Sequence, residues 1–488
     1  MLKVVAFFPE LVLFCMALYL LFSNLYRSSQ QTDKGTFMPP FVSKVGYYFF
    51  VGTLFLCLAL GWRMAEKETV LLDIFSIDRL SLASKVGVAL VGLPWLGLGA
   101  KGIRRSFQRE NMRSFEYPSL LLFSLTGSFL LFSSNHMVGI FIALILQILP
   151  LLVALSLYED KTLSIVWGVR YFILESICLA FFIFGSALFY GAGGDLTLKS
   201  ISVFCQSMAQ EGAYDLKVVI GFFMIFVAFL LRLAAFPFHL WMKGFCEASS
   251  NLIVPFMLTI YFSVFVVLAK LLFETFYGVA DLWKPIVFGI GLLSSLWGAV
   301  GALFQTRIRS FFSYNYMFHL GMVLLGLSSG VVEGLQAVLL YWTVYTLSAC
   351  TFFFFWSNLS VNDQMLDTID QAKGLGTQHP AFTLLISLTL LSLASMPPLA
   401  GFWCKLYILK SLISVGWGYV SALLFFTIIA SFQYFHIIRA IYFADQGTEI
   451  RLTYEWRTLW TLVPPVLVGF FLFQDRTLLF ISALLKSL

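Results

Sequence analysis

The chain has 488 residues, of which 60 % are hydrophobic and only 11 % are charged, and its mean hydropathy is +0.90. Soluble domains carry about 25 % charged residues, so the composition excludes an ordinary soluble protein and indicates an integral membrane protein. The net charge of +6 is modest for this length, and the basic residues fall mostly in loops, so no nucleic-acid partner is expected.

Apolar runs separated by polar loops predict an all-α polytopic membrane protein with about 14 transmembrane helices. Each run is close to the ~20 residues that an α-helix needs to cross a ~30 Å hydrocarbon core. The first run lacks a clear cleavage site and is expected to be the first span. The expected spans are residues 4–23, 45–62, 83–100, 117–134, 137–157, 164–190, 217–240, 252–277, 285–305, 312–330, 333–357, 381–411, 416–442 and 457–484.

Clustered lysines and arginines predict the orientation of the chain. They lie in the loops after spans 1, 3 and 9, which share one face because each follows an odd-numbered span. This basic face is expected to be cytoplasmic or matrix-facing. The longest loop of the opposite face, residues 191–216, adds only Lys199. An even number of spans then places both termini on that opposite face.

Two spans are interrupted by proline. Span 7 contains Pro237, and span 12 contains Pro397-Pro398. Proline in a helix interior removes the hydrogen bond to the carbonyl four residues earlier, and lipid cannot satisfy the freed carbonyl. The 31 residues from Gly374 to Cys404 carry no charged side chain, so the second break is expected at membrane depth. Each break must therefore face protein or water.

The two breaks fall in the fourth helix of two five-helix units, spans 4–8 and spans 9–13. Because five is odd, the second unit is expected to be an inverted repeat of the first. Paired interrupted helices in inverted repeats indicate a transport path near the midplane of the membrane. The expected segments are 1–116, with three helices, 117–277 and 278–442, the two five-helix units, and 443–488, the C-terminal helix.

Lys405 follows Pro398 by seven residues, close to two helical turns, so the two lie on nearly one helix face. An ionisable group beside a broken membrane helix is a candidate functional residue, and a buried lysine can exchange its proton. The alternative is a lysine that extends to the membrane interface together with Lys410.

Arg232 and Glu175 are charged residues inside apolar spans. An arginine keeps its proton at ordinary pH, so Arg232 can hold a carboxylate or freed carbonyls in place but cannot carry a proton. Glu175 needs a cationic partner, for which Arg170, Arg232 and Lys405 are candidates. A proton path and a structural ion pair remain alternative roles for both Glu175 and Arg232.

Two histidines, a lysine and two tyrosines complete the candidates. His239 and His319 flank apolar segments and are either packing residues or proton relays, because the unperturbed pKa of histidine is near 6.5. Lys270 is either a relay or a residue at the membrane interface. Tyr341 and Tyr345, four residues apart, either pack between helices or line a water-filled path.

No motif indicates a cofactor held by this chain. The seven cysteines form no C-x-x-C pair and are expected to be small buried residues. A Walker loop, a metal-binding set and a Rossmann fingerprint are all absent from the sequence. No redox site is therefore expected in the chain itself.

The broken spans resemble those of the antiporter-like subunits of respiratory complex I. The stretch from Pro397 to Phe402, followed by Lys405, resembles the helix 12 motif of that family. Pro237-Phe238-His239-Leu240-Trp241 resembles its PFHxW motif in helix 7. The stretch from Arg309 through His319 to Gly321 is similar to KRLLAYSSIxHxG, and Pro9-Glu10, Asp78, Ser81 and Lys85 also fit. The resemblance covers nearly the whole chain, and the number of spans is typical of the subunit N group, called chain 2 in mitochondria.

The resemblance implies a membrane-arm subunit of complex I that contributes to redox-driven proton translocation through buried charged residues. Its partners would be other membrane-arm subunits and lipids. The cofactors of the whole complex, FMN, iron–sulfur clusters and ubiquinone, would lie in other subunits.

The chain departs from the family pattern at three of four titratable positions. Ile145 stands where the family has a helix 5 glutamate, Arg232 matches its helix 7 lysine, and Phe262 falls at its helix 8 lysine, with Lys270 the nearest basic residue. Lys405 alone is retained. Either Glu175 replaces the lost acid as counter-ion to Arg232, or the path is degraded or rerouted, which is the favoured expectation.

Three functions remain open: a proton-translocating subunit of complex I, a structural subunit with a degraded path, and a stand-alone cation/proton antiporter. The 54 phenylalanines and the absence of a targeting peptide favour the mitochondrial inner membrane. A bacterial plasma membrane and a thylakoid are the alternatives.

Overall fold

The computed structural model describes residues 7–30, 51–53, 68–70, 73–97, 117–156, 162–211, 215–249, 253–361, 364–443 and 449–452. Twelve of the fourteen expected spans fall on helices in this part of the chain. Spans 45–62 and 457–484 lie outside the described residues, apart from the helical residues 51–53. Six of the described helices are long and apolar enough to cross a membrane, which supports a multi-pass membrane protein.

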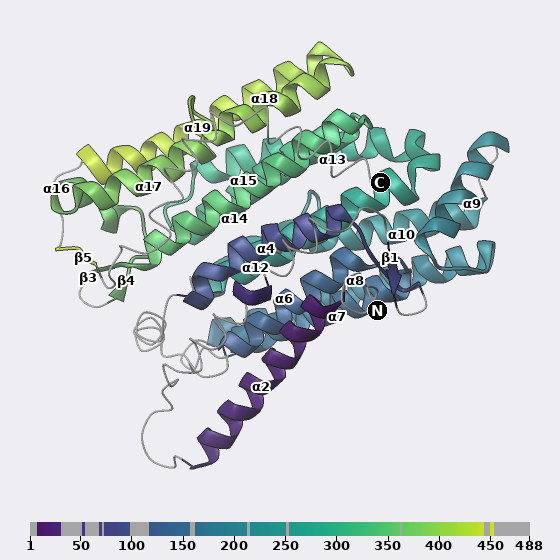
Figure 1. Ribbon diagram of the computed structural model, residues 1–488. Helices are drawn as coiled ribbons and strands as arrows, with labels where there is room; N and C mark the ends of the chain where they lie inside the picture. The colour runs from purple at the N-terminus through teal and green to yellow at the C-terminus, as the bar shows by residue number, and fades with distance from the viewer. Residues whose placement is uncertain are drawn as a thin grey trace. The chain divides into compact units, whose positions relative to one another are not determined.

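The described residues form two compact units, each of them a bundle of long helices (Figure 1). The first unit holds residues 7–233 and 255–280, and the second holds 234–254 and 281–452. The first contains α2 (Phe8–Gln30), β1 (Glu68–Val70), β2 (Phe75–Ile77), α4 (Arg79–Gly97), α6 (Tyr117–Ser133), α7 (Met137–Ser156), α8 (Thr162–Gly193), α9 (Leu198–Glu211), α10 (Leu216–Arg232), α12 (Val254–Lys270), the π-helical turn η1 (Leu271–Thr275) and the 3-10 turn η2 (Tyr277–Val279).

The second unit begins with the short helix α11 (Leu240–Ala248), which packs on α14 (Ile308–Ser328). Its other elements are α13 (Ala280–Leu303), α15 (Val332–Ser357), β3 (Leu359–Val361), β4 (Gln364–Met365), the 3-10 turn η3 (Asp370–Ala372), α16 (Leu375–Gln378), α17 (Pro380–Leu393), α18 (Ala400–Ile413), α19 (Trp417–Phe443) and β5 (Arg451–Leu452). α14 and α15 lie at its centre, where almost every residue of both helices is buried.

Small residues set the closest helix packing of the first unit. A Cβ added to Gly185 of α8 would lie 2.7 Å from the carbonyl oxygen of Gly221 in α10. Only two glycines allow the backbones to approach this closely, as in membrane helix pairs with small residues at the crossing. The crossing fixes α8 against α10 and thereby brings the polar residues of the two helices together.

Both proline-containing spans are broken, as the sequence predicts. α10 ends at Arg232 and α17 ends at Leu393, and a non-helical segment follows each of them. Within these segments Ala234 has φ +52° and Ser395 has φ +61°, each three residues before a proline. Neither residue is a glycine, so both backbones are held in a conformation that most side chains avoid.

The loops of each unit gather by parity, as alternate crossings of a membrane require. In the first unit, β1 pairs antiparallel with β2 in the loop after span 2. Phe75 of β2 bridges to Ser134 after span 4, and His136 bridges to Thr197 after span 6. These bridges join the loops after spans 2, 4 and 6. In the second unit, β3 lies between β4 and β5 and joins the loops after spans 11 and 13. A bridge from Arg307 to Thr368 adds the loop after span 9.

The expectation that residues 191–216 form a plain loop was wrong. Leu198–Glu211 is the helix α9, which buries Leu198, Ile201, Cys205 and Met208. These positions recur at three- and four-residue spacing, the pattern of an amphipathic helix. The polar face lowers the average hydropathy, so a search for apolar runs passes over this element.

Candidate functional site

A buried ion pair joins α8 and α10 in the first unit. Nη1 of Arg232 lies 3.4 Å from Oε2 of Glu175, and the two side chains are 2 % and 1 % exposed. Of the three candidate partners for Glu175, the structure therefore selects Arg232. Arg170 is exposed, and its guanidinium lies 4.9 Å from the Trp167 ring centroid, so it does not join the pair.

Gln147 of α7 holds the guanidinium of Arg232 from another side. Its Oε1 accepts a 3.1 Å hydrogen bond from Nη2 of Arg232. Its Nε2 donates to Ser128 at 2.8 Å and to Ser263 at 2.6 Å. Five helices thus converge on one polar centre, and the fixed charge of Arg232 is tied to all of them.

Arg232 also has unused hydrogen-bonding capacity. Its Nε and Nη1 atoms have no hydrogen-bond partner among the described residues. A cavity of about 10 Å³ touches Arg232 and is otherwise lined by Leu144, Cys178, Leu179, Phe182, Ala228 and Phe229.

Lys270 is buried at the end of α12. Its Nζ lies 3.6 Å from Oδ2 of Asp78, and the two side chains are 5 % and 1 % exposed. Oδ1 of Asp78 accepts a 2.6 Å bond from the backbone N–H of Ser81 and so caps α4. Lys270 therefore does not extend to the interface, and the π-helical turn η1 follows it directly. Such turns are frequent at functional sites.

A further buried pair, between α2 and α4, was not among the candidate residues. Nζ of Lys85 lies 2.5 Å from Oε1 of Glu10, and that oxygen also accepts a 2.9 Å bond from Ser133. Both charged side chains are at most 1 % exposed. Each sits in an apolar run of the sequence, which marks each residue as a candidate but does not indicate which two residues pair.

Lys405 lies inside the second unit, on α18 just beyond the second break. It is 5 % exposed, and its Nζ is 5.6 Å from the ring centroid of Phe318. Lys410, by contrast, is exposed, so Lys405 does not extend to the interface with it. Among the described residues no carboxylate lies within ion-pair distance of Lys405.

His319 of α14 is the centre of a hydroxyl cluster near Lys405. Its Nδ1 is 2.5 Å from the Tyr341 hydroxyl, and its Nε2 is 2.9 Å from the Tyr434 hydroxyl. Tyr434 in turn donates to Asn315. Phe318, whose ring lies beneath the Lys405 ammonium, is the residue before His319 in α14. The structure therefore brings these two candidate residues together.

His239 lies apart from this cluster, in the first break. Its ring stacks on Phe236, with centroids 5.5 Å apart, and lies 5.4 Å from the Trp297 ring. Aromatic packing thus accounts for most of its surroundings. Across the described residues, no three His, Cys, Asp or Glu side chains are grouped in a way that could hold a metal ion.

Comparison with known proteins identifies the family. The model of the NADH:quinone oxidoreductase/Mrp antiporter transmembrane family matches residues 134–431, more than half of the chain. The chain belongs to this antiporter family. NADH-quinone oxidoreductase subunit N of Pelagibacter ubique is 29 % identical over 444 residues, which are 89 % of this chain and 88 % of that protein. Subunit N of Paramagnetospirillum magneticum is 26 % identical over 495 residues, 96 % of each chain.

Solved structures show the same antiporter-family fold. A chain of respiratory complex I from Thermus thermophilus with bound aureothin has a TM-score of 0.79 at 22 % identity, covering 96 % of this chain and 98 % of that one. A chain of the Mrp complex from Dietzia sp. has a TM-score of 0.79 at 14 % identity, covering 98 % of this chain and 95 % of that one. The fold is therefore shared by redox-linked and antiporter assemblies.

The antiporter-family positions can now be placed in the structure. Ile145 is only partly buried, and the polar α7 side chain at Arg232 is Gln147, two residues later. Phe262 is 4 % exposed and packs edge-on against Phe132, with centroids 6.3 Å apart. Phe262 therefore brings an apolar ring and no charge to this position of the first unit. Sequence reasoning missed Gln147, because a single amide in an apolar helix does not indicate which residue it contacts.

Proposed function

We propose that the chain is the N-type membrane-arm subunit of an NADH:quinone oxidoreductase and contributes to redox-coupled proton translocation. The observation that carries this function is the close match, over about nine-tenths of both chains, to relatives named subunit N. The buried Lys405 beside a broken helix supports the same function. The chain itself holds no redox cofactor in this proposal; FMN, iron–sulfur clusters and quinone belong to partner subunits.

Lys405 is the proposed proton carrier of the second unit. A buried ammonium without a carboxylate partner is costly, so its protonation responds to small changes in nearby charge. His319 has two hydrogen-bonded hydroxyls and directly follows Phe318, whose ring lies beneath Lys405, so we assign it as the group that exchanges protons with Lys405. Redox steps elsewhere in the complex would change the charge that Lys405 experiences.

The architecture proposed with this function has 14 spans and two inverted repeats, with segments 1–116, 117–277, 278–442 and 443–488. The two breaks support the repeat because their geometry is the same. The helix before each break ends five residues before a proline, at Arg232 before Pro237 and at Leu393 before Pro398. The next residue caps each helix through its N–H, as Leu233 bonds to Phe229 and Ala394 bonds to Leu390.

The first unit favours a second function for that half, a fixed structural charge. Arg232 cannot release its proton, Gln147 cannot titrate, and Phe262 is apolar. Among the described residues, Glu175 is then the one carboxylate of this centre, and it is the counter-ion of Arg232. We propose that the proton path through the first unit is degraded and that the Glu175–Arg232 pair holds this half together.

The relatives from Pelagibacter ubique, Rhodospirillum rubrum and Paramagnetospirillum magneticum are bacterial, which supports a bacterial plasma membrane rather than the mitochondrial inner membrane. The partners in this proposal are other membrane-arm subunits and lipids. A stand-alone antiporter remains the competing function because the Mrp chain shares the fold. Co-purification with a quinone-reducing assembly would support the proposed function, and isolation as an independent transporter would contradict it.

The test of proton translocation is Lys405→Ala in the intact complex, reconstituted into vesicles. We expect quinone reductase assembly to remain and the number of protons moved per electron to fall. Lys410→Ala, an exposed lysine on the same helix, is the matched control and should pump like the parent. Parent-like pumping by Lys405→Ala would contradict the proposal.

A further inference from the structure

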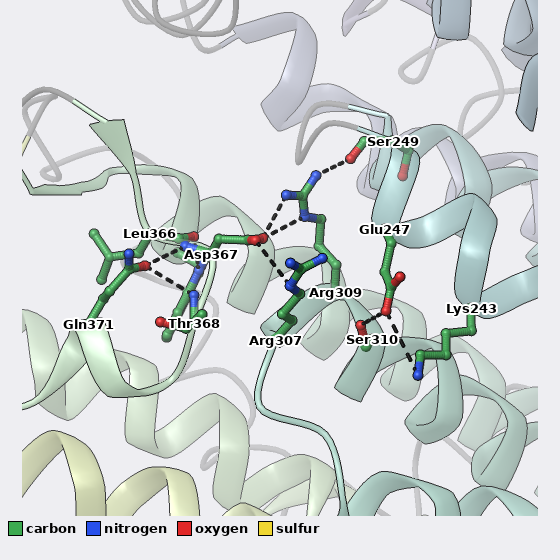
Figure 2. Close-up of polar contacts among 11 residues, drawn as sticks. Lys243, Glu247, Ser249, Arg307, Arg309, Ser310, Leu366, Asp367, Thr368 and Gln371 are labelled. Atoms are coloured by element: carbon green, nitrogen blue, oxygen red, sulfur yellow. Dashed lines mark hydrogen bonds and ion pairs between the residues drawn. The ribbon is translucent and has the colours of Figure 1, made fainter. Parts of the chain in front are cut away.

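A carboxylate lies at the loop face of the second unit and has no role in the path described above. Glu247 of α11 is 26 % exposed. Its Oε1 accepts a 2.6 Å hydrogen bond from the Ser310 hydroxyl at the start of α14. Lys243, one turn earlier on α11, has its Nζ 3.9 Å from the same oxygen, as Figure 2 shows.

The surroundings of Glu247 are held in place by ionic contacts. Arg309 donates to the carbonyl of Ser249, the residue directly after α11, and pairs with Asp367 at 2.6 Å (Figure 2). Gln371 fixes the Asp367 loop by accepting the backbone N–H of Asp367 at 2.9 Å. α11, α14 and this loop therefore stay together. The charged groups around Glu247 are Lys243 and Arg309, and Asp367 already neutralises Arg309.

Polar side chains continue inward from Glu247. Its neighbour Cys246 is buried, as are Tyr316 of α14 and Tyr345 of α15. The Tyr345 ring is 4.3 Å from the His319 ring, centroid to centroid. These side chains come from α11, α14 and α15. They lie between the partly exposed carboxylate and the cluster around His319.

Two atoms along this route lack partners. The Tyr345 hydroxyl and Nδ2 of Asn315 have no hydrogen bond to any described residue, although the two side chains are 3 % and 2 % exposed. Buried polar groups without protein partners usually bind ordered water. Asn315 lies one turn before His319 on α14, so these two side chains share one face of that helix. Asn315 and Tyr345 are therefore the two places where waters would bind on the way to His319.

We propose that Glu247 is the proton-collecting group of the second unit. It takes a proton from water at the basic face and passes it, through waters bound to Asn315 and Tyr345, to His319 and Lys405. Only O–H and N–H bonds form and break, and one proton is moved for each one taken up. This inference rests on the function proposed above and adds to it the site at which protons enter the path.

The deciding variant is Glu247→Gln in the reconstituted complex. The amide still accepts the Ser310 hydroxyl bond but cannot collect a proton, so a merely structural role would be preserved. Proton-transfer groups commonly contribute about 10²–10⁴-fold, and we expect coupled turnover to fall by at least about tenfold. Glu449→Gln is the matched control, because Glu449 is 76 % exposed, pairs with Arg451, and precedes a strand of the same loop face.

A second variant keeps the test decisive if Glu247→Gln fails to assemble. Tyr345→Phe removes only the unpartnered hydroxyl and keeps the ring against His319, and it should also slow coupled turnover. Parent-like turnover of the Glu247→Gln variant overturns the inference. If only the Tyr345→Phe variant assembles, parent-like turnover of that variant overturns it instead. If Lys405→Ala lowers pumping while Glu247→Gln does not, Glu247 is structural and the proposed function stands. If Lys405→Ala also pumps normally, the proposed function itself fails.

Discussion

At the residue scale, the first unit differs from the usual antiporter-family centre through a few side chains. Glu175 and Arg232 form an ion pair that is almost fully buried, and Gln147 adds a hydrogen bond to Arg232. Such a pair contributes little net stability while both partners are present, but removing one partner leaves an uncompensated buried charge. Substituting one partner of the pair therefore tests whether this centre is structural or functional.

Glu175→Gln should lower the free energy of unfolding of the first unit by about 3–5 kcal/mol, because Arg232 would keep its charge without a counter-ion. The measurement is thermal inactivation of the purified complex. Arg170→Gln is the control, since Arg170 is exposed and stacks only on Trp167, and it should change stability by less than about 1 kcal/mol. Equal stability of the two variants would contradict the ion-pair interpretation.

The sequence predicted Glu175 and Arg232 as charged residues inside spans, because a charge among apolar neighbours is visible in one dimension. It left three partners open for Glu175, since only the packing of α8 on α10 decides between them. Gln147 and the Glu10–Lys85 pair were missed for a related reason. The distance between Glu10 and Lys85 along the chain carries no information about their 2.5 Å contact.

At the element scale, close packing of α8 on α10 depends on glycine. Gly185→Ala places a Cβ 2.7 Å from the Gly221 carbonyl oxygen, so the helices must separate, at a cost of about 1–3 kcal/mol. Gly168→Ala, in the same helix, meets nothing within 4 Å and should be neutral or slightly stabilising, because alanine favours helix. Thermal inactivation of both variants checks the difference, and a reversed order would exclude this crossing as a tight contact.

The start of α9 offers a test by pH outside the membrane. Hydrogen bonds from Ser200, and then from Thr197, lower the pKa of Asp195 to about 2. A carboxyl with a lowered pKa stabilises the folded state above its unfolded pKa of about 3.9, and this stabilisation is lost as pH falls towards 2. Asp195 should therefore stabilise α9 by the same amount at every pH between 5 and 8, as measured by the protection of the α9 amides from hydrogen exchange.

Asp195→Asn should remove most of that contribution and raise exchange in α9 about fivefold, as expected for a weakened helix start. The effect should be equal at pH 5 and pH 8. A difference between the two pH values would mean that Asp195 titrates in this range, contrary to its hydrogen bonding. Lys199→Gln, an exposed change in the same turn, serves as the control.

Element positions were the most predictable feature of the chain. The two breaks coincide with Pro237 and Pro397-Pro398, and a proline removes one hydrogen bond of the helix ladder. Proline alone does not decide a break, because α7 continues through Pro150. α9 could not be predicted from apolar runs, since half of its surface is polar. Its four buried residues at three- and four-residue spacing would have been found by a search for helical periodicity.

At the scale of the whole molecule, each unit joins loops of one parity. The bridge Arg307–Thr368 joins loops after odd-numbered spans in the second unit, and the bridge His136–Thr197 joins loops after even-numbered spans in the first. Clustered lysines and arginines lead us to expect the loops after odd-numbered spans on the cytoplasmic side. Glu247 lies in the loop region after span 7, so this orientation would let it take up protons from the cytoplasm.

Single-cysteine labelling tests this orientation. Lys373 is 43 % exposed, in the loop after span 11, and Lys199 is exposed, in the loop after span 6. A membrane-impermeant maleimide should label Lys373→Cys only in inside-out vesicles and Lys199→Cys only in right-side-out vesicles, with Cys15, which is exposed, replaced in both. Labelling from the same side would contradict alternate crossing. Labelling from the reversed sides would keep the fold but place Glu247 on the face where protons are released, which would exclude it as the collecting group.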